Sequence, residues 1–307
     1  IDYNAQEGLL INGKPVKLRG GCVHHDNGIL GAAAFSRAEE RKVEIMKANG
    51  FNAIRTSHNP PSARFLDACD RLGVLVIDEA FDKWAADISQ PDGYFKVFEK
   101  YWQQDLKYMI LRDRNHPSVI MWSIGNEIPA WNDTSAMEVR RKLSDAVRAL
   151  DPTRPVTEAI AGAVWTKKSP AFDQLDEMLD IVGYNYDWRP MPQSHTLYPE
   201  RLMMTTESHP FDMYSIWQQI EKSPWIIGDF VWTGMDYLGE SGVGYEKTEN
   251  EKEKVDLLPE ADADLIKSIG QYSDLFLQFG RRWPWFNAYC GDIDIIGNKK
   301  PQSYYRD

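Results

Sequence analysis

Short apolar runs alternate along the chain with longer segments in which apolar residues recur at helical spacing. Residues 74–78 are apolar up to a final aspartate, which is typical of a parallel strand covered on both faces. The preceding segment, 61–72, carries one apolar stripe and is followed by Gly73, a common helix stop. Eight segments of the first kind are predicted strands: 16–23, 51–56, 74–78, 119–124, 155–158, 181–184, 202–206 and 225–232.

Segments with helical spacing occupy the intervals between these strands. The first is predicted to open with a capping box made by Ser36 and Glu39 and to end at Gly50. The predicted helices are 36–50, 61–72, 94–115, 133–150, 171–179, 213–222 and 261–279. Alternation of this kind indicates the α/β class and a parallel sheet closed into a (β/α)₈ TIM barrel, which we predict as a single domain over residues 1–307.

Composition narrows the class of protein. The 307 residues are 43% hydrophobic, which suits a globular chain with a large core, and the net charge of −11 argues against binding to nucleic acid. No apolar run approaches the ~20 residues of a membrane helix. Three cysteines without a CxxC pair suggest neither a disulfide framework nor a zinc site.

Polar and ionisable residues collect where the predicted strands end. Active-site groups of barrels lie at the carboxyl ends of the strands, and buried polar groups are costly unless they are paired. A ring of such groups at one rim therefore indicates a ligand site rather than a requirement of the fold. The groups concerned are 24–26, 55–59, 78–79, 125–127, 184–186, 206–207 and Trp232.

Two glutamates in this ring stand out. Glu127 follows the fourth predicted strand and Glu207 the seventh, so both would face the barrel mouth. Hydrolysis of a glycosidic bond uses two carboxyl groups, one that protonates the leaving oxygen and one that attacks the anomeric carbon, about 5 Å apart in retaining enzymes. The pair is compatible with a glycosidase, and a retaining one requires this short separation. A surface or salt-bridged carboxylate is the ordinary alternative for each glutamate alone.

A long motif links the sequence to a known family. Residues 112–127, RDRNHPSVIMWSIGNE, resemble the acid/base signature of glycoside hydrolase family 2, and several other segments are similar to motifs of the same family. These segments are 10–14 with 18–20, 54–60, 228–232 and 289–292.

The resemblance implies roles for particular residues. Glu127 would be the general acid/base, and Asn126 would contact the sugar 2-hydroxyl. Glu207 would be the nucleophile, with Tyr186 hydrogen-bonded to it and Arg55 holding it ionised. Further contacts with substrate are implied for His24, His58, Asn59, Trp232 and Trp285.

The resemblance also bears on cofactors and on the parent protein. Some β-galactosidases of the family bind magnesium through residues that align with Lys83 and Ala85, neither of which is a suitable ligand, so we predict no metal and no cofactor. Family members normally carry β-sandwich domains ahead of the barrel. Because the chain opens without Met, we expect an excised catalytic domain, and export to the periplasm or outside the cell is compatible with glycan degradation.

The sugar and some alternatives stay open. β-Galactosidase is the favoured activity, since residues 24–26, 291–294 and 300–307 look most like that branch, with β-glucuronidase and β-mannosidase as alternatives. The Asn-x-Lys pattern of glucuronidases is taken as absent, the nearest resemblance being 298–300. A metal hydrolase is disfavoured because neighbouring histidines on a strand face opposite ways; its ligands would be His24, His25, Asp26, His58 and Asp78. A non-catalytic carbohydrate-binding barrel is the rival of another class. The charged stretch 246–264 is predicted as a solvated loop or a rim over the site.

Overall fold

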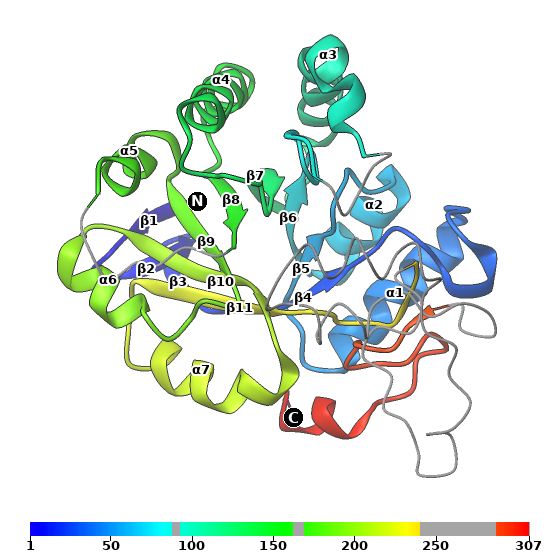
Figure 1. Cartoon of the computed structure of the whole chain (residues 1–307). Helices are drawn as coiled ribbons and strands as arrows, with labels where there is room; N and C mark the ends of the chain where they lie inside the picture. The colour runs from blue at the N-terminus through cyan, green and yellow to red at the C-terminus, as the bar shows by residue number, and fades with distance from the viewer. Residues whose placement is uncertain (88–92, 162–168, 240–286, 307) are drawn as a thin grey trace, which may run out of the picture.

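Eight parallel strands close into a barrel, as the sequence predicts (Figure 1). The computed structural model describes residues 1–87, 93–161, 169–239 and 287–306. Neighbouring strands pair in the order β10-β11-β4-β5-β6-β7-β8-β9, so that β11 closes the sheet against β4. The strands are β4 (Leu18–Val23), β5 (Ala53–Thr56), β6 (Leu75–Glu79), β7 (Val119–Asn126), β8 (Val156–Ile160), β9 (Ile181–Asn185), β10 (Leu202–Ser208) and β11 (Ile226–Val231).

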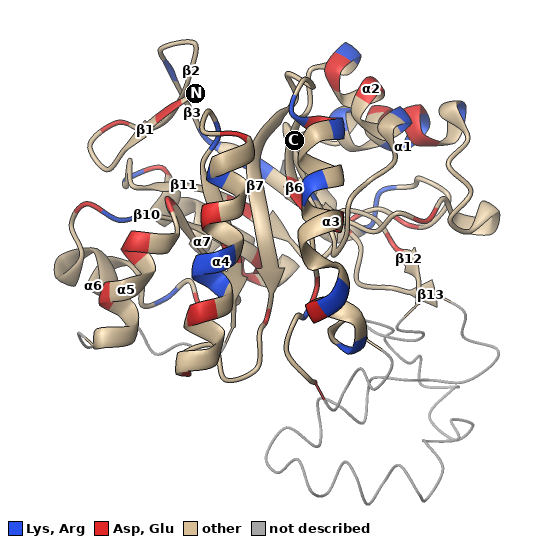
Figure 2. Ribbon diagram, turned by 90° about the horizontal axis from the view of Figure 1, so that it is seen from above, with Lys and Arg blue, Asp and Glu red and all other residues tan. Residues whose placement is uncertain are grey.

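Helices surround this sheet, and Figure 2 marks the charged residues along them. Ser62 caps the amino end of α2 by accepting a hydrogen bond from the Phe65 N–H, and Gly73 closes the helix in the left-handed region at φ 69°. The short helix α6 was not predicted. The helices are α1 (Ser36–Ala48), α2 (Ala63–Leu72), α3 (Phe95–Asp113), α4 (Thr134–Leu150), α5 (Pro170–Met178), α6 (Met191–Leu197) and α7 (Met213–Ile220).

The predicted capping box of α1 is wrong. The N-cap is Phe35, whose side chain makes no capping hydrogen bond, and Ser36 is the first helical residue. Glu39 turns inward instead of back toward the N-cap, because its carboxylate accepts a hydrogen bond from the Ser62 hydroxyl at 3.2 Å. Both Glu39 and Lys42 are buried against the barrel.

A small antiparallel sheet covers one end of the barrel. Its strands are β1 (Asp2–Asn4), β2 (Gly8–Ile11) and β3 (Lys14–Val16), and Figure 2 shows them opposite the end toward which β7 points. The predicted first strand, 16–23, is therefore divided between β3 and β4. Leu9 of this sheet belongs to the apolar cluster inside the barrel, and a second cluster fills the space between strands and helices. The closed amino-terminal end leaves the opposite mouth for chemistry.

The segments after β11 return to that mouth. The strands β12 (Tyr237–Leu238) and β13 (Asn287–Ala288) pair beside it, and the 3₁₀ turn η4 (Pro301–Arg306) follows them. Two other 3₁₀ turns come earlier in the chain, η1 (Gly28–Leu30) after β4 and η2 (Pro210–Asp212) after β10. The predicted helix 261–279, the charged stretch 246–264 and Trp285 lie outside the described residues. None of the helices in the described ranges is both long and apolar enough to cross a membrane.

Candidate active site

Arg55 is the centre of a buried polar network at the carboxyl ends of the strands. Its side chain is completely buried, and its guanidinium donates to both carboxylate oxygens of Glu79, at 2.8 and 2.9 Å. The same group donates to Glu207 Oε1 at 3.0 Å and to Asn126 Oδ1 at 2.9 Å. One cation therefore joins residues from β5, β6, β7 and β10, and it orients both predicted catalytic strands.

Glu207 is held from two sides. Arg55 Nη1 donates to its Oε1, and the Tyr186 hydroxyl donates to its Oε2 at 2.8 Å. Burial nevertheless raises the pKa of Glu207 to about 8, with repulsion from Glu127 adding to the shift and Arg55 and Tyr186 opposing it. The expectation that Arg55 keeps this carboxylate ionised is thus only partly met: the contact forms, but lost hydration outweighs it.

Glu127 lies where β7 leaves the sheet. Its backbone adopts the left-handed region at φ 46°, as does Tyr186 at φ 64°, which is uncommon for residues other than glycine and is often found at functional sites. Asn185 Nδ2 donates to Glu127 Oε1 at 3.0 Å and to Asn126 Oδ1 at 3.1 Å. The Asn185 amide therefore links the end of β9 to the end of β7, next to the Glu127 carboxyl group.

Four aromatic rings pack against one another beside the carboxyl groups and form a cluster, the ring box, of His24, His58, Trp232 and Tyr237. His58 stacks on Trp232 with centroids 5.0 Å apart, and His24 stacks on Tyr237 at 4.1 Å while its edge meets Trp232 at 5.5 Å. Burial lowers the pKa of His58 to about 3, with Arg55 adding to this effect, and lowers the pKa of His24 well below its usual value. Both imidazoles are neutral near pH 7, so each carries one donor and one acceptor for hydroxyl groups.

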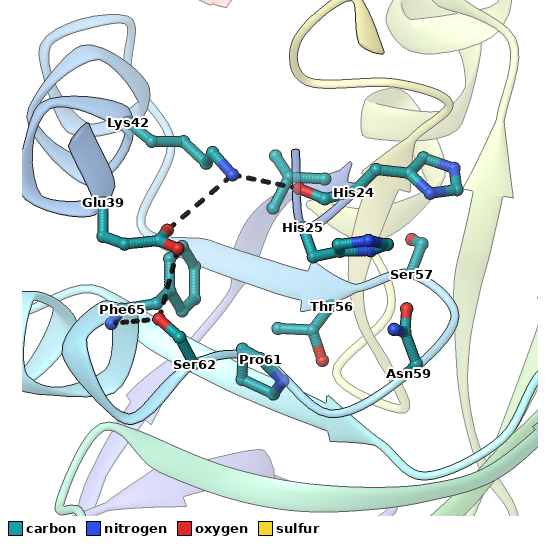
Figure 3. A pocket seen from close by; sticks show the side chains of 11 residues that line it. His24, His25, Glu39, Lys42, Thr56, Ser57, Asn59, Pro61, Ser62 and Phe65 are labelled. Carbon is teal, nitrogen blue, oxygen red and sulfur yellow. Dashed lines mark hydrogen bonds and ion pairs between the residues drawn. The ribbon is translucent and has the colours of Figure 1, made fainter. Parts of the chain in front are cut away.

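The structure brings most of the predicted site residues together. Arg55, Asn126, Tyr186 and Glu207 share hydrogen bonds, Glu127 joins them through Asn185, and His24, His58 and Trp232 make the ring box. Asn59 is not part of this group. It is exposed and lines a separate small pocket with His25, as Figure 3 shows, because the chain turns away after His58.

Three site residues were missed individually. Glu79 pairs with Arg55 and accepts a hydrogen bond from Ser123 Oγ at 2.6 Å. It also accepts from His58 Nδ1 at 2.8 Å when the neutral imidazole of His58 carries its proton on Nδ1. Asn185 joins the two halves of the site, and Tyr237 supports His24. A signal existed for the first two, since both stand in polar runs at strand ends. Tyr237 follows β11 without such a signal.

Cationic side chains near the mouth that lie within the described ranges have partners of their own. Lys83 forms an ion pair with Asp87 at 2.7 Å, and its side chain is 11% exposed. Asn298 and Lys300 do stand two residues apart, so the spacing considered absent is present in the sequence. In the structure Asn298 Nδ2 donates to Asp294 Oδ2 at 3.0 Å, while Lys300 donates to the Tyr289 carbonyl at 2.7 Å and pairs with Asp236. This arrangement does not form a free carboxylate receptor.

A metal site would need a cluster of ligand side chains in the part of the chain that the structure describes. No group of three or more His, Cys, Asp or Glu side chains there could hold a metal ion. Asp82, near the end of β7, instead accepts from Asn126 Nδ2 at 3.1 Å.

Known proteins match this chain over most of its length. The family model for glycosyl hydrolases family 2, TIM barrel domain, matches residues 4–239. A protein named beta-galactosidase BoGH2A from Bacteroides ovatus is 35% identical over 315 residues, covering 78% of this chain and 36% of the relative. A putative beta-glucuronidase from Formosa agariphila is 29% identical and covers 79% of this chain and 27% of the relative.

Solved structures agree. A crystal structure of a glycosyl hydrolase family 2 member from Bacteroides cellulosilyticus superposes with a TM-score of 0.83 and 43% identity, covering all of this chain and 35% of that one. Fold, barrel-mouth carboxyl groups and sequence relatives define a barrel of the glycoside hydrolase class. The chain belongs to glycosyl hydrolase family 2. It spans about a third of the length of the Bacteroides ovatus and Bacteroides cellulosilyticus relatives.

Proposed function

We propose that this chain hydrolyses terminal β-D-galactosides with retention, using Glu127 as acid/base and Glu207 as nucleophile. The observation that carries the proposal is the hold on Glu207, whose two oxygens are bound separately by Arg55 and Tyr186. A carboxylate aimed in this way is suited to attack at a fixed point. The assignment is to the catalytic unit of a longer protein that also carries accessory β-sandwich domains.

In the first step, Glu207 attacks the anomeric carbon while the glycosidic C–O bond breaks. Glu127 gives its proton to the leaving oxygen, and a glycosyl ester on Glu207 results. As the carboxylate loses charge, the Tyr186 hydroxyl and the Arg55 guanidinium remain within hydrogen-bond distance of its oxygens. Asn126, held by Arg55, Asn185 and Asp82, is positioned to bind the 2-hydroxyl, a contact that strengthens in the transition state.

In the second step, Glu127 removes a proton from water, which attacks the anomeric carbon and releases Glu207. The backbone of Glu127 and the Asn185 amide hold this carboxyl in place for both proton transfers. Trp232 offers an apolar face for the sugar ring, and His24 and His58 offer neutral donor and acceptor nitrogens for its hydroxyl groups.

The choice of a neutral sugar follows from the partners of the cations. Recognition of a uronic acid needs a cationic group free to bind its carboxylate. Among the described residues of the mouth, Arg55 is taken by Glu79 and Glu207, Lys83 by Asp87 and Lys300 by Asp236. β-Glucuronidase is the second candidate, because relatives of that name also align with the chain.

The test is covalent trapping with 2-deoxy-2-fluoro-β-galactosyl fluoride, followed by intact-mass spectrometry and peptide mapping. The expected result is a one-sugar adduct on Glu207, because the fluorine slows release of the ester more than its formation. The matching glucuronyl reagent, used in parallel, distinguishes the two sugars. An adduct on another residue would overturn the nucleophile assignment, and an adduct with only the glucuronyl reagent would overturn galactose.

A further inference from the structure

Two charged residues occupy core positions of α1 behind the ring box. The buried face of this helix consists of Glu39, Lys42, Val43 and Met46, which is the spacing of an apolar stripe. The side chains of Glu39 and Lys42 are 4% and 7% exposed and lie 3.8 Å apart, Oε2 to Nζ. Figure 3 shows both reaching from the helix toward the end of β4.

The fold gives no reason for charges at these positions. Burial lowers the pKa of Lys42, since the charged form loses its hydration, with the negative charges of Glu39 and Asp26 opposing the shift. Replacement of a buried ion pair by apolar residues of similar size is often neutral or stabilising. Because stability alone does not require this ion pair, its role must lie in the groups that it contacts.

Each partner holds a loop of the candidate active site. Lys42 Nζ donates to the backbone carbonyl of His24 at 3.1 Å. Glu39 Oε1 accepts from the hydroxyl of Ser62, which caps α2 directly after the loop that carries His58. The pair thus connects the two histidine-bearing strand ends through a single helix (Figure 3).

The contact with His24 lies at the point where the side chains of the strand diverge. His24 stacks on Tyr237 in the ring box, whereas His25 is exposed, and both histidines line a small cavity of about 10 Å³ with Glu39 and Lys42. His24 Nε2 is buried and has no hydrogen-bond partner within the described structure. An imidazole nitrogen without a protein partner can pair with a hydroxyl group, and Lys42 holds the backbone carbonyl of the same residue.

We propose that the Glu39–Lys42 pair positions His24 for contact with a sugar hydroxyl, acting through the backbone of β4 and never touching substrate. Lys42 and Glu39 are positioning residues, and His24 is the group that meets the ligand. This inference rests on the proposed function for the sugar. The geometry that it describes can also be tested without turnover.

The central variant is Glu39→Leu/Lys42→Met, which removes both charges and so leaves no unpaired ion in the core. We expect kcat/KM for a 4-nitrophenyl β-glycoside to fall about tenfold, mostly through KM, because a displaced hydrogen-bonding group weakens the hold on substrate. Thermal stability should be unchanged or higher. Glu39→Gln/Lys42→Gln can keep both hydrogen bonds without charge and should restore activity to within about twofold.

The controls separate positioning from general damage. Lys47→Met removes an exposed lysine of the same helix, which donates to the Leu72 carbonyl, and should leave kinetics unchanged. In a His24→Ala background the Leu/Met pair should cost less than about twofold, since the group it positions is gone. An equal loss in both backgrounds would overturn the proposal, as would full activity of the Leu/Met variant.

A second measurement does not depend on catalysis. In protein labelled with ¹³C-histidine, the His24 ring signal, identified by its absence from His24→Ala, should shift in the Leu/Met variant and stay in place in Lys47→Met. An unshifted signal would overturn positioning by this pair. If no glycoside is turned over but the signal shifts, the proposed function fails while the positioning of His24 stands.

Discussion

Among the residues that the structure describes, Arg55 and Arg140 are wholly buried, and their partners differ. Arg140 of α4 faces one carboxylate, Glu158 of β8, with two parallel contacts of 2.6 and 2.7 Å. Arg55 at the mouth is shared by Glu79 and Glu207. The first pair is balanced and holds a helix on the sheet. The second has more negative than positive groups, and the pKa of Glu207 is raised there, chiefly by burial and further by repulsion from Glu127.

The Arg140–Glu158 pair stabilises the fold, whereas the arrangement around Arg55 sets the charge of the candidate catalytic groups. A one-to-one bidentate pair satisfies the donors of arginine and the lone pairs of the carboxylate. In the shared arrangement one guanidinium cannot neutralise two anions, and Glu127 adds a third carboxyl nearby, as its repulsion of Glu207 shows. Substitutions in the Arg55 network should therefore chiefly change turnover, and substitutions in the Arg140–Glu158 pair should chiefly change stability.

The largest expected effect is on turnover in Glu207→Gln. The amide cannot form the covalent ester, so kcat should fall by about 10⁴-fold or more while the fold is kept. Steady-state assays on an activated aryl glycoside, with circular dichroism as the control for folding, measure this. Activity within tenfold of the wild type would refute the role of Glu207.

The balanced pair should respond in stability instead. Glu158→Gln leaves the Arg140 charge buried without its anion and should lower the free energy of unfolding by ~3–5 kcal/mol. Activity per folded molecule should stay within about twofold, because Glu158 contacts the helix layer and not the mouth. Urea unfolding monitored by fluorescence gives the first quantity. A selective loss of kcat with normal stability would contradict the contrast drawn between the pairs.

Glu207→Gln should also stabilise the protein at higher pH. The pKa of Glu207 is raised to about 8 from 4.5, so the folded state binds its proton more tightly than the unfolded state does. The contribution of this carboxyl is then fully present below pH 4.5 and is lost as pH rises through about 8. We expect the variant to exceed the wild type by roughly 1–3 kcal/mol at pH 8 and to match it near pH 4. Thermal melts across this range test the trend, and a variant less stable at pH 8 would reverse it.

The smallest effect concerns the coupling between the two carboxyl groups. Glu127→Gln removes a negative charge that raises the pKa of Glu207, so Glu207 should ionise at lower pH. For a substrate with a good leaving group, which needs little acid catalysis, the acidic limb of kcat/KM should move down by about one pH unit. Profiles of both proteins on a dinitrophenyl glycoside provide the comparison, and an upward shift would contradict it.

Sequence alone predicted the barrel because each strand is a short apolar run that ends in polar residues. That pattern led directly to Glu127, Asn126, Arg55 and Glu207, all of which meet at one rim. It could not predict how charge is distributed there, because the pKa of Glu207 depends on depth and neighbours rather than on spacing. The failed capping box at Ser36 has the same origin: a tertiary contact with Ser62 takes the side chain of Glu39.

The closing seam of the barrel has a consequence for the order of events during folding. Leu18 of β4 pairs with Gly228 of β11, so the two edges of the sheet meet only after some two hundred intervening residues have been synthesised. Such long-range closure is slow, since loop entropy must be lost before the pairing energy is gained. Until then, residues of β4 and β5 have no fixed relation to those of β10. We expect the ring box and the Arg55 network to form late and together. A folding intermediate in which the barrel is not yet closed should therefore be inactive.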